Sequence, residues 1–175
     1  MTHTPSDADR LDRLECRLAE LEAERAIARL LASYGPIVDS GSAERAASLW
    51  EPHGVYDVDN LLMDGPAEID AMVRGDLHQG IITGGSAHLL GPHQITVDGD
   101  TAVAIGHSLL VRHEDGRFVV ARATAHHWSL CQGPEGWRVV RRVARVLDGR
   151  AEARALLALA ADPAGSSPAT SPARA

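Results

Sequence analysis

Four β-rich runs follow one another in the second half of the chain: SAHLLGPHQITVDGD (86–100), TAVAIGHSLLVRHEDG (101–116), RFVVARATAHHWSLC (117–131) and GWRVVRRVARVL (136–147). Turn signals separate them at Asp98-Gly99, at Asp115-Gly116 and between Gly133 and Gly136. Hydrophobic runs joined by Asp-Gly pairs are typical of β-hairpins. We therefore expect an antiparallel meander from residue 86 onward.

The chain before these runs is helical in pattern. From Asp7 to about Ser33 it contains no Gly or Pro and repeats leucine at 3,4,3 spacing, which predicts a helix. The leucines form a narrow stripe surrounded by charge (Leu11, Leu14, Leu18 and Leu21). Such a stripe is typical of a subunit contact rather than of a core helix. We therefore expect a homo-oligomer, either a dimer or a trimer.

Between residue 34 and the β-rich half, the sequence predicts a kink or break in the first helix and then two further helices. The Tyr34-Gly35-Pro36 step should kink or break the first helix, because proline lacks the amide donor. The stretch Asp39-Ser40-Gly41-Ser42 supplies a turn and an N-cap for a second helix that reaches about Trp50. Residues 66–78 should form a third helix with Pro66 in its first turn.

Helices first and a curved antiparallel sheet second predict an α+β fold, in which the sheet wraps around the helices and leaves a pocket between them. The expected organisation is a flexible N-terminus (1–9), one domain (10–150), a C-terminal helical extension (151–161) and a disordered tail (162–175). The tail is rich in proline, serine and alanine and has almost nothing to bury.

Composition and motifs exclude several classes of function. A net charge of −7 gives no positive surface for a nucleic acid. No apolar run is long enough for a membrane span or a signal peptide, so we expect a cytoplasmic protein without a membrane partner. The sequence contains no compact metal-ligand motif and no GxGxxG or P-loop pattern, so we expect neither a metal nor a cofactor.

The order of elements, together with several local motifs, resembles the SnoaL-like branch of the nuclear transport factor 2-like superfamily over roughly residues 10–150. The motifs are RLLASY (29–34), VDSGSAERAASLWEPHGVYDV (38–58), DGPAEIDAMV (64–73), AHLLGPHQITVDGDTAVA (87–104) and GWRVVRRVARVLDGR (136–150). The resemblance implies a cone-shaped fold. It extends to scytalone dehydratase, bile acid 7α-dehydratase and hexachlorocyclohexane dehydrochlorinase, and the superfamily also includes ketosteroid isomerase, polyketide cyclases and proteins without any chemistry.

The resemblance implies three catalytic residues. Asp39 and His88 match the aspartate that orients a histidine in the dehydratase-type members, and Tyr34 matches a tyrosine five residues before that aspartate. A carboxylate makes a histidine a better general base, and a tyrosine can protonate a leaving hydroxyl or polarise a carbonyl. The plainer alternative is that Asp39 caps the second helix, His88 is an ordinary strand residue and Tyr34 packs at the kink.

Aromatic residues and one histidine are the candidates to bind substrate. Few aromatics occur in the chain, so those near the motifs are expected to shape an apolar pocket (Tyr56, Trp50 and Trp128), although Trp50 also suits core packing. Alternation along 117–131 puts His127 on a face of small residues that leaves room for a ligand. The row of arginines in 138–145 is expected to be a solvated outer face or a salt-bridge network between subunits rather than an anion site.

These residues predict a cofactor-free lyase or isomerase that resembles a dehydratase and acts on a small hydrophobic or polycyclic molecule. In this hypothesis His88, oriented by Asp39, removes an activated C–H proton and Tyr34 assists. Two alternatives stay open. One is a non-catalytic protein that binds a hydrophobic ligand or a partner, and the other is a polyketide cyclase.

Overall fold

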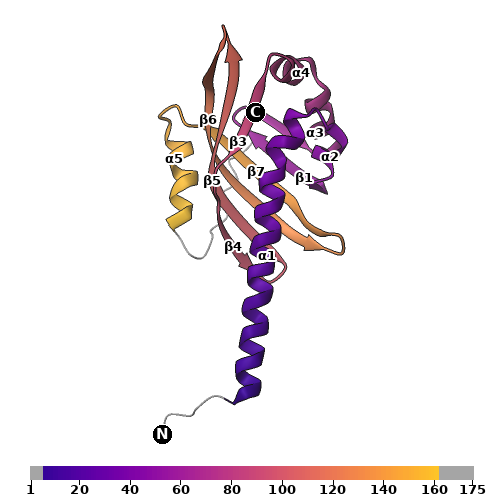
Figure 1. Ribbon diagram of the computed structural model, residues 1–175, viewed down its shortest axis with the longest axis vertical. Helices are drawn as coiled ribbons and strands as arrows, with labels where there is room; N and C mark the ends of the chain where they lie inside the picture. Colours follow the sequence, from indigo (N-terminus) through magenta and orange to yellow (C-terminus); the bar gives the residue numbers. More distant parts are fainter. Residues whose placement is uncertain (1–5, 162–175) are drawn as a thin grey trace, which may run out of the picture.

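The computed structural model describes residues 6–161, which form an α+β fold with one long helix lying against a curved, open sheet (Figure 1). The fold class predicted from the sequence is confirmed. Residues 1–5 and 162–175 lie outside the described residues, and with them lie the expected disordered tail and most of the expected flexible N-terminus.

The first helix, α1 (Asp7–Asp39), begins earlier than the predicted domain boundary at residue 10. Ser6 caps it: the Ser6 hydroxyl accepts from the Asp9 amide, and the Asp9 carboxylate accepts from the Ser6 amide. This reciprocal capping satisfies two backbone donors that the helix itself cannot. Only the second half of α1 reaches the core, through side chains that begin at Ile27.

The sequence predicts a kink or a break at Tyr34-Gly35-Pro36, and there is no break, because α1 runs through this step without interruption to Asp39. A proline inside a helix costs about 3 kcal/mol, so packing on both sides of it has to outweigh that cost. Gly35 provides part of this packing. A Cβ at position 35 would lie 2.1 Å from the carbonyl oxygen of His88, so only glycine lets the helix approach the neighbouring strand this closely.

The remaining N-terminal helices are shorter than the sequence predicts. Helix α2 (Ala43–Ala47) ends before Trp50, which opens the first strand, and its N-cap position is Ser42 rather than Asp39. The expected helix 66–78 is two helices, α3 (Pro66–Arg74) and α4 (Asp76–Thr83). Gly75 separates them because its ψ of 150° is extended rather than helical.

Seven strands form one sheet, in the order β2-β1-β7-β6-β5-β3, and β4 also pairs with β5. Their bounds are β1 (Trp50–Val58), β2 (Leu61–Asp64), β3 (Ser86–Leu90), β4 (Gln94–Asp98), β5 (Thr101–Glu114), β6 (Arg117–Gly133) and β7 (Gly136–Val146). The predicted antiparallel meander is confirmed for β5, β6 and β7. The first β-rich run carries two strands instead of one, and β1 pairs with β7 in parallel.

The sheet buries residues on both faces. One face, with α1, α2 and α3, encloses the main core around Trp50, Trp128 and Ile69. On the other face, helix α5 (Ala151–Ala158) and the 3₁₀ turn Leu159–Ala161 close the described chain, and Ala153 and Leu156 of α5 pack on Ala125 and Val143. Among residues 6–161, no helix has both the length and the apolar character that crossing a membrane requires.

Candidate active site

Asp39 and His88, which lie 49 residues apart in the sequence, form a close hydrogen-bonded pair. Asp39 is the last residue of α1, and its Oδ1 lies 2.6 Å from His88 Nδ1. Its Oδ2 accepts the backbone amide of His88 at 2.7 Å, and Ser86 donates its hydroxyl to Oδ1 at 3.3 Å. The carboxylate therefore joins the end of α1 to β3 and does not cap α2.

This geometry fixes which nitrogen of His88 is basic. Because an ionised carboxylate only accepts, Nδ1 carries the proton and donates it, and Nε2 keeps its lone pair. Burial lowers the pKa of His88, and the Asp39 hydrogen bond and charge partly oppose that effect. The His88 side chain stays 24% exposed, so a ligand can reach it. At neutral pH the imidazole of His88 is therefore neutral, and Asp39 holds it in one tautomer, as a general base requires.

A cavity of about 160 Å³ opens beside this pair, between α1 and the sheet. Most of the exposed surface of its wall is apolar. The residues with purely apolar side chains are Val38, Val58, Leu61, Met63, Met72 and Leu110. The polar part consists of two tyrosines, three histidines, two arginines and two hydroxyl residues (Tyr34, Tyr56, His78, His88, His126, Arg122, Arg142, Ser108 and Thr124). A cavity of this size holds a molecule of about one aromatic ring.

Arg142, on β7, places a buried positive charge in this wall. The residue is only 3% exposed, and its Nη1 has no hydrogen-bond partner. Its guanidinium carbon lies 4.2 Å from the centre of the Trp128 ring and 4.4 Å from the centres of Tyr34 and Tyr56. Aromatic faces attract a cation but do not neutralise it. Among residues 6–161 the guanidinium therefore keeps its positive charge beside the cavity, where it attracts an anionic oxygen.

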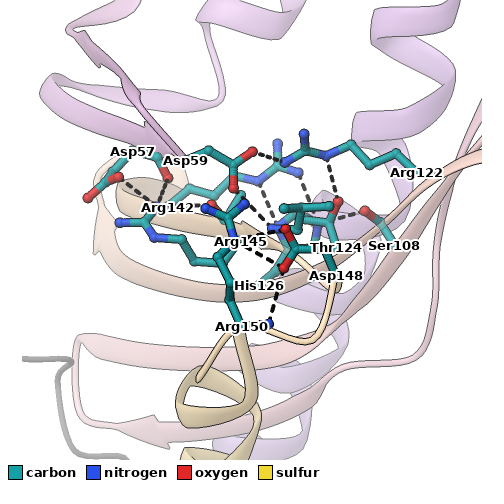
Figure 2. A network of polar contacts seen from close by, with 12 residues as sticks. Asp57, Asp59, Ser108, Arg122, Thr124, His126, Arg142, Arg145, Asp148 and Arg150 are labelled. Atoms are coloured by element: carbon teal, nitrogen blue, oxygen red, sulfur yellow. Dashed lines mark hydrogen bonds and ion pairs between the residues drawn. The ribbon is translucent and has the colours of Figure 1, made fainter. Parts of the chain in front are cut away.

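The neighbouring arginines pair with carboxylates. Arg145 contacts Asp57 at 2.7 Å (Figure 2), and Arg141 contacts the same carboxylate at 2.8 Å. Arg122 pairs with Asp59 and donates from Nε to Thr124 Oγ1 at 3.0 Å. These ion pairs lie within one chain, so the expected salt-bridge network between subunits stays a prediction, and the expected solvated face is wrong for Arg142, which is buried.

Ser108 and His126 form a second polar pair in the wall, next to Arg142 (Figure 2). The Ser108 Oγ lies 2.6 Å from His126 Nε2, and Arg142 Nε donates to His126 Nδ1 at 3.4 Å. Burial first, and then the charge of Arg142, hold the pKa of His126 well below its ordinary value. Arg142 Nη2 also lies 3.5 Å from His126 Nε2, so both His126 nitrogens face the guanidinium. When Nδ1 accepts from Arg142, His126 donates from Nε2 to Ser108 and leaves the serine hydrogen for a ligand.

The structure brings together four of the residues singled out in the sequence. Tyr34, Tyr56 and His88 line the cavity, and Asp39 stands directly behind His88. Burial raises the pKa of Tyr34 to about 12, so its phenol keeps its proton and can donate it.

The other three predicted pocket residues do not line the cavity. Trp50 packs behind the two tyrosines, with its ring 5.8 Å from Tyr34 and 6.1 Å from Tyr56. Trp128 is fully buried behind Arg142. His127 lies on the opposite face of β6 from His126, with Ala125. The small residues of that face make room for α5 rather than for a ligand, so the choice of His127 over His126 was wrong.

Four functional candidates were missed in the sequence: His78, Ser108, His126 and Arg142. His78 lies on α4, is buried, and donates from Nε2 to the carbonyl of Val38 at 2.9 Å. Its ring centre lies 5.7 Å from that of His88. Alternation along β6 places His126 on the same face as Trp128. This shared face was the signal in the sequence that could have identified His126 as a cavity residue. Within residues 6–161, no three His, Cys, Asp or Glu side chains gather as metal ligands.

Comparisons with known proteins agree with this architecture. The SnoaL-like domain family matches residues 19–143. An NTF2-like protein with a cystatin-like fold from Novosphingobium aromaticivorans is 44% identical, with a TM-score of 0.82 over 84% of this chain and 96% of its own. Comparison with curated proteins finds no match.

More distant solved structures share the fold alone. A function unknown protein from Mycobacterium tuberculosis is 18% identical, with a TM-score of 0.63 over 85% of this chain and 88% of its own. Aln2 from a Streptomyces species is 15% identical, with a TM-score of 0.66 over 73% of this chain and 92% of its own. The resemblance predicted from the sequence is confirmed: the chain belongs to the SnoaL-like domain family, with the NTF2-like, cystatin-like fold.

Proposed function

We propose that the protein is a cofactor-free lyase or isomerase in which His88 removes a proton from a carbon next to a carbonyl group. One observation carries the proposal. His88, oriented by Asp39, and the buried guanidinium of Arg142 line the same cavity. A base for the carbon acid and a cation for the oxygen are the two groups that enolate formation needs.

The first step forms an enolate. His88 Nε2 takes the proton, the C–H electron pair forms a C–C double bond, and the carbonyl electrons move to the oxygen. The guanidinium charge of Arg142 stabilises the resulting oxyanion, and the hydroxyl of Ser108 donates to it when His126 carries its proton on Nε2. Asp39 stabilises the imidazolium that forms, because its carboxylate accepts from Nδ1 at 2.6 Å.

The second step decides between elimination and isomerisation. In elimination, a β-hydroxyl leaves with the phenol proton of Tyr34 as water, and the imidazolium proton then returns to the tyrosinate. In isomerisation, His88 returns the same proton to the γ-carbon of a β,γ-unsaturated ketone. With its pKa raised to about 12, the phenol of Tyr34 is protonated at neutral pH and therefore holds the proton that the leaving hydroxide takes.

The cavity favours the small hydrophobic substrate of the sequence hypothesis over the polycyclic one. About 160 Å³ accommodates roughly one ring, and the apolar wall suits a hydrocarbon body. A cyclase would have to fold a longer chain in the same space. The non-catalytic alternative differs in one respect only: a ligand would occupy this cavity without losing a proton.

Proton exchange separates catalysis from binding. Small cyclic β-hydroxy ketones and β,γ-unsaturated ketones are incubated with the protein in D₂O, and loss of the carbon-bound proton signal is followed by NMR. We expect His88→Ala and Asp39→Asn each to slow the exchange by at least about a hundredfold. His53→Ala is the matched control, because His53 is exposed on β1 outside the cavity. Unchanged exchange in His88→Ala, or ligands that bind the wild type without exchanging, would refute the proposal.

A further inference from the structure

The first half of α1 projects away from the body of the protein (Figure 1). Its four leucines are 57–60% exposed, and the match to the SnoaL-like family begins only at residue 19. These leucines are Leu11, Leu14, Leu18 and Leu21, here called the leucine stripe. Four exposed leucines on one helical segment form an apolar surface that a partner has to cover.

The body of the same chain cannot cover the stripe. The α1 residues buried in the core are Ile37, Val38 and, nearer to the leucine stripe, Ile27, Leu31 and Tyr34. With about 100° of rotation per residue, the leucine stripe lies on roughly the opposite side of the helix from these three. A partner helix can therefore lie along the stripe with the body on the far side.

The charges that flank the stripe fit a second copy of this chain in parallel. The stripe occupies the a and d positions of a heptad, which places Arg10, Arg17 and Glu24 at g and Glu15, Glu22 and Arg29 at e. In a parallel pair, each g residue faces the e residue five positions later in the partner. The three pairs are Arg10 with Glu15, Arg17 with Glu22, and Glu24 with Arg29, and all three join opposite charges.

An antiparallel pair fits less well. Placing the four leucines against one another in opposite directions brings Arg17 near the second copy's Arg17, and Glu15 near the second copy's Glu15. Both juxtapositions are repulsive. Arg25 and Ala28 occupy the next two seam positions, so the apolar seam ends after Leu21.

We propose that α1 pairs with α1 of a second copy as a short, parallel, in-register coiled coil over residues 11–21. The seam spans about two heptads, so the association is weak and depends on concentration. The four leucines form the buried seam, and the flanking charges set the direction and register.

Cysteine cross-linking tests the direction. In a Cys16→Ser background, Leu14→Cys should form a disulfide-linked dimer on mild oxidation, because in-register d positions face each other only in the parallel pair. A mixture of the Leu11→Cys and Leu21→Cys proteins is the control, because position 11 of one copy meets position 21 of the other only in the antiparallel pair. Formation of the mixed 11–21 disulfide, identified by mass spectrometry, at the expense of the Leu14→Cys dimer would overturn the proposal.

Charge reversal tests the register. By sedimentation of the full chain, Arg17→Glu should weaken dimerisation by about three- to tenfold, because it faces Glu22 of the second copy. Arg17→Glu with Glu22→Arg should restore it, since residues five apart on one helix do not face each other. A monomer at every concentration, a dimer that survives Leu14→Glu with Leu18→Glu, or a double reversal that restores nothing would each overturn the proposal.

Discussion

Arg142 differs from the arginines beside it in what surrounds its charge. Arg141 and Arg145 share the carboxylate of Asp57, whereas Arg142 is buried among aromatic rings and leaves Nη1 without a partner. Burying a cation without a carboxylate costs several kcal/mol. Arg142 therefore lowers the free energy of unfolding of the ligand-free protein. Binding of the proposed enolate would offset this loss.

Replacing Arg142 should separate stability from activity. We expect Arg142→Met to raise the free energy of unfolding by about 1 to 3 kcal/mol, because methionine fills similar volume without a buried charge. The same change should slow proton exchange at least about a hundredfold, because the oxyanion loses its donor. Urea unfolding and the NMR exchange assay measure the two effects.

Arg141→Met is the matched control for this change. It removes a partly exposed ion pair with Asp57, so it should lower stability by no more than about 1 kcal/mol and leave the exchange rate close to wild type. An Arg142→Met protein that is both less stable and fully active would show that the charge is structural.

The sequence predicted the Asp39–His88 contact but not Arg142, and the reason is a bulge. The β6–β7 register shifts between Ser129 and Leu130, so Val140 on β7 has no partner. Before the bulge Val139 faces the core, and after it Arg142 does. Simple alternation along β7 puts these two residues on opposite faces, so it could not show that Arg142 points inward.

The contact between α1 and β3 positions the site, and Gly35 sets its distance. The helix approaches so closely that a Cβ at Gly35 would overlap the His88 carbonyl oxygen. One turn later the same helix delivers Asp39 to the His88 amide and ring. The Gly-Pro pair, which looked like a break in the sequence, is therefore the place where the helix meets the strand. Helix propensity alone could not predict this, because it omits tertiary packing.

Adding a methyl group at Gly35 should push α1 and β3 apart. We expect Gly35→Ala to lower the free energy of unfolding by at least about 2 kcal/mol, because the overlapping atom belongs to backbone. Gly80→Ala is the matched control. Gly80 is exposed within α4 and has open space around its Cβ position, so alanine should stabilise the protein by up to about 1 kcal/mol. Urea unfolding measures both, and equal effects would refute this role of Gly35.

At the scale of the whole molecule, the sequence predicts the antiparallel part of the sheet but not the strand that pairs in parallel with it. Four β-rich runs with Asp-Gly turns were sufficient to predict the β5–β6–β7 meander, because hairpins depend on local sequence. The parallel pairing of β1 with β7 joins residues more than 80 positions apart, such as Val55 and Arg141, and no local signal specifies it. That pairing brings Tyr56 beside Arg142, and so it completes the cavity.

Buried neutral histidines should make the folded protein sensitive to acid. Burial lowers the pKa of His93 to about 4 and that of His126 well below 6.5. The unfolded chain therefore binds more protons than the folded one below pH 6.5. Stability is complete above pH 6.5 and is lost as the pH falls toward the folded-state values, by up to about 1.4 kcal/mol per pH unit for each histidine.

Urea unfolding between pH 6.5 and 5 measures this loss, which we expect to reach about 2 to 3 kcal/mol. His93→Gln should reduce the pH dependence without abolishing it, because other buried histidines remain, whereas His53→Gln, at an exposed site, should leave it unchanged. An unfolding free energy that stays constant over this range would contradict the burial of neutral rings.

The state of the His88 ring is the most direct test of the proposed base, and it requires no substrate. NMR of ¹⁵N-labelled histidine across a pH titration reports the tautomer and the pKa together. We expect a neutral ring at pH 7 with its proton on Nδ1, a pKa below 6.5, and a still lower pKa in Asp39→Asn, where the raising effect of the carboxylate is lost. A ring that is charged at pH 7, or one that carries its proton on Nε2, would contradict the proposed base.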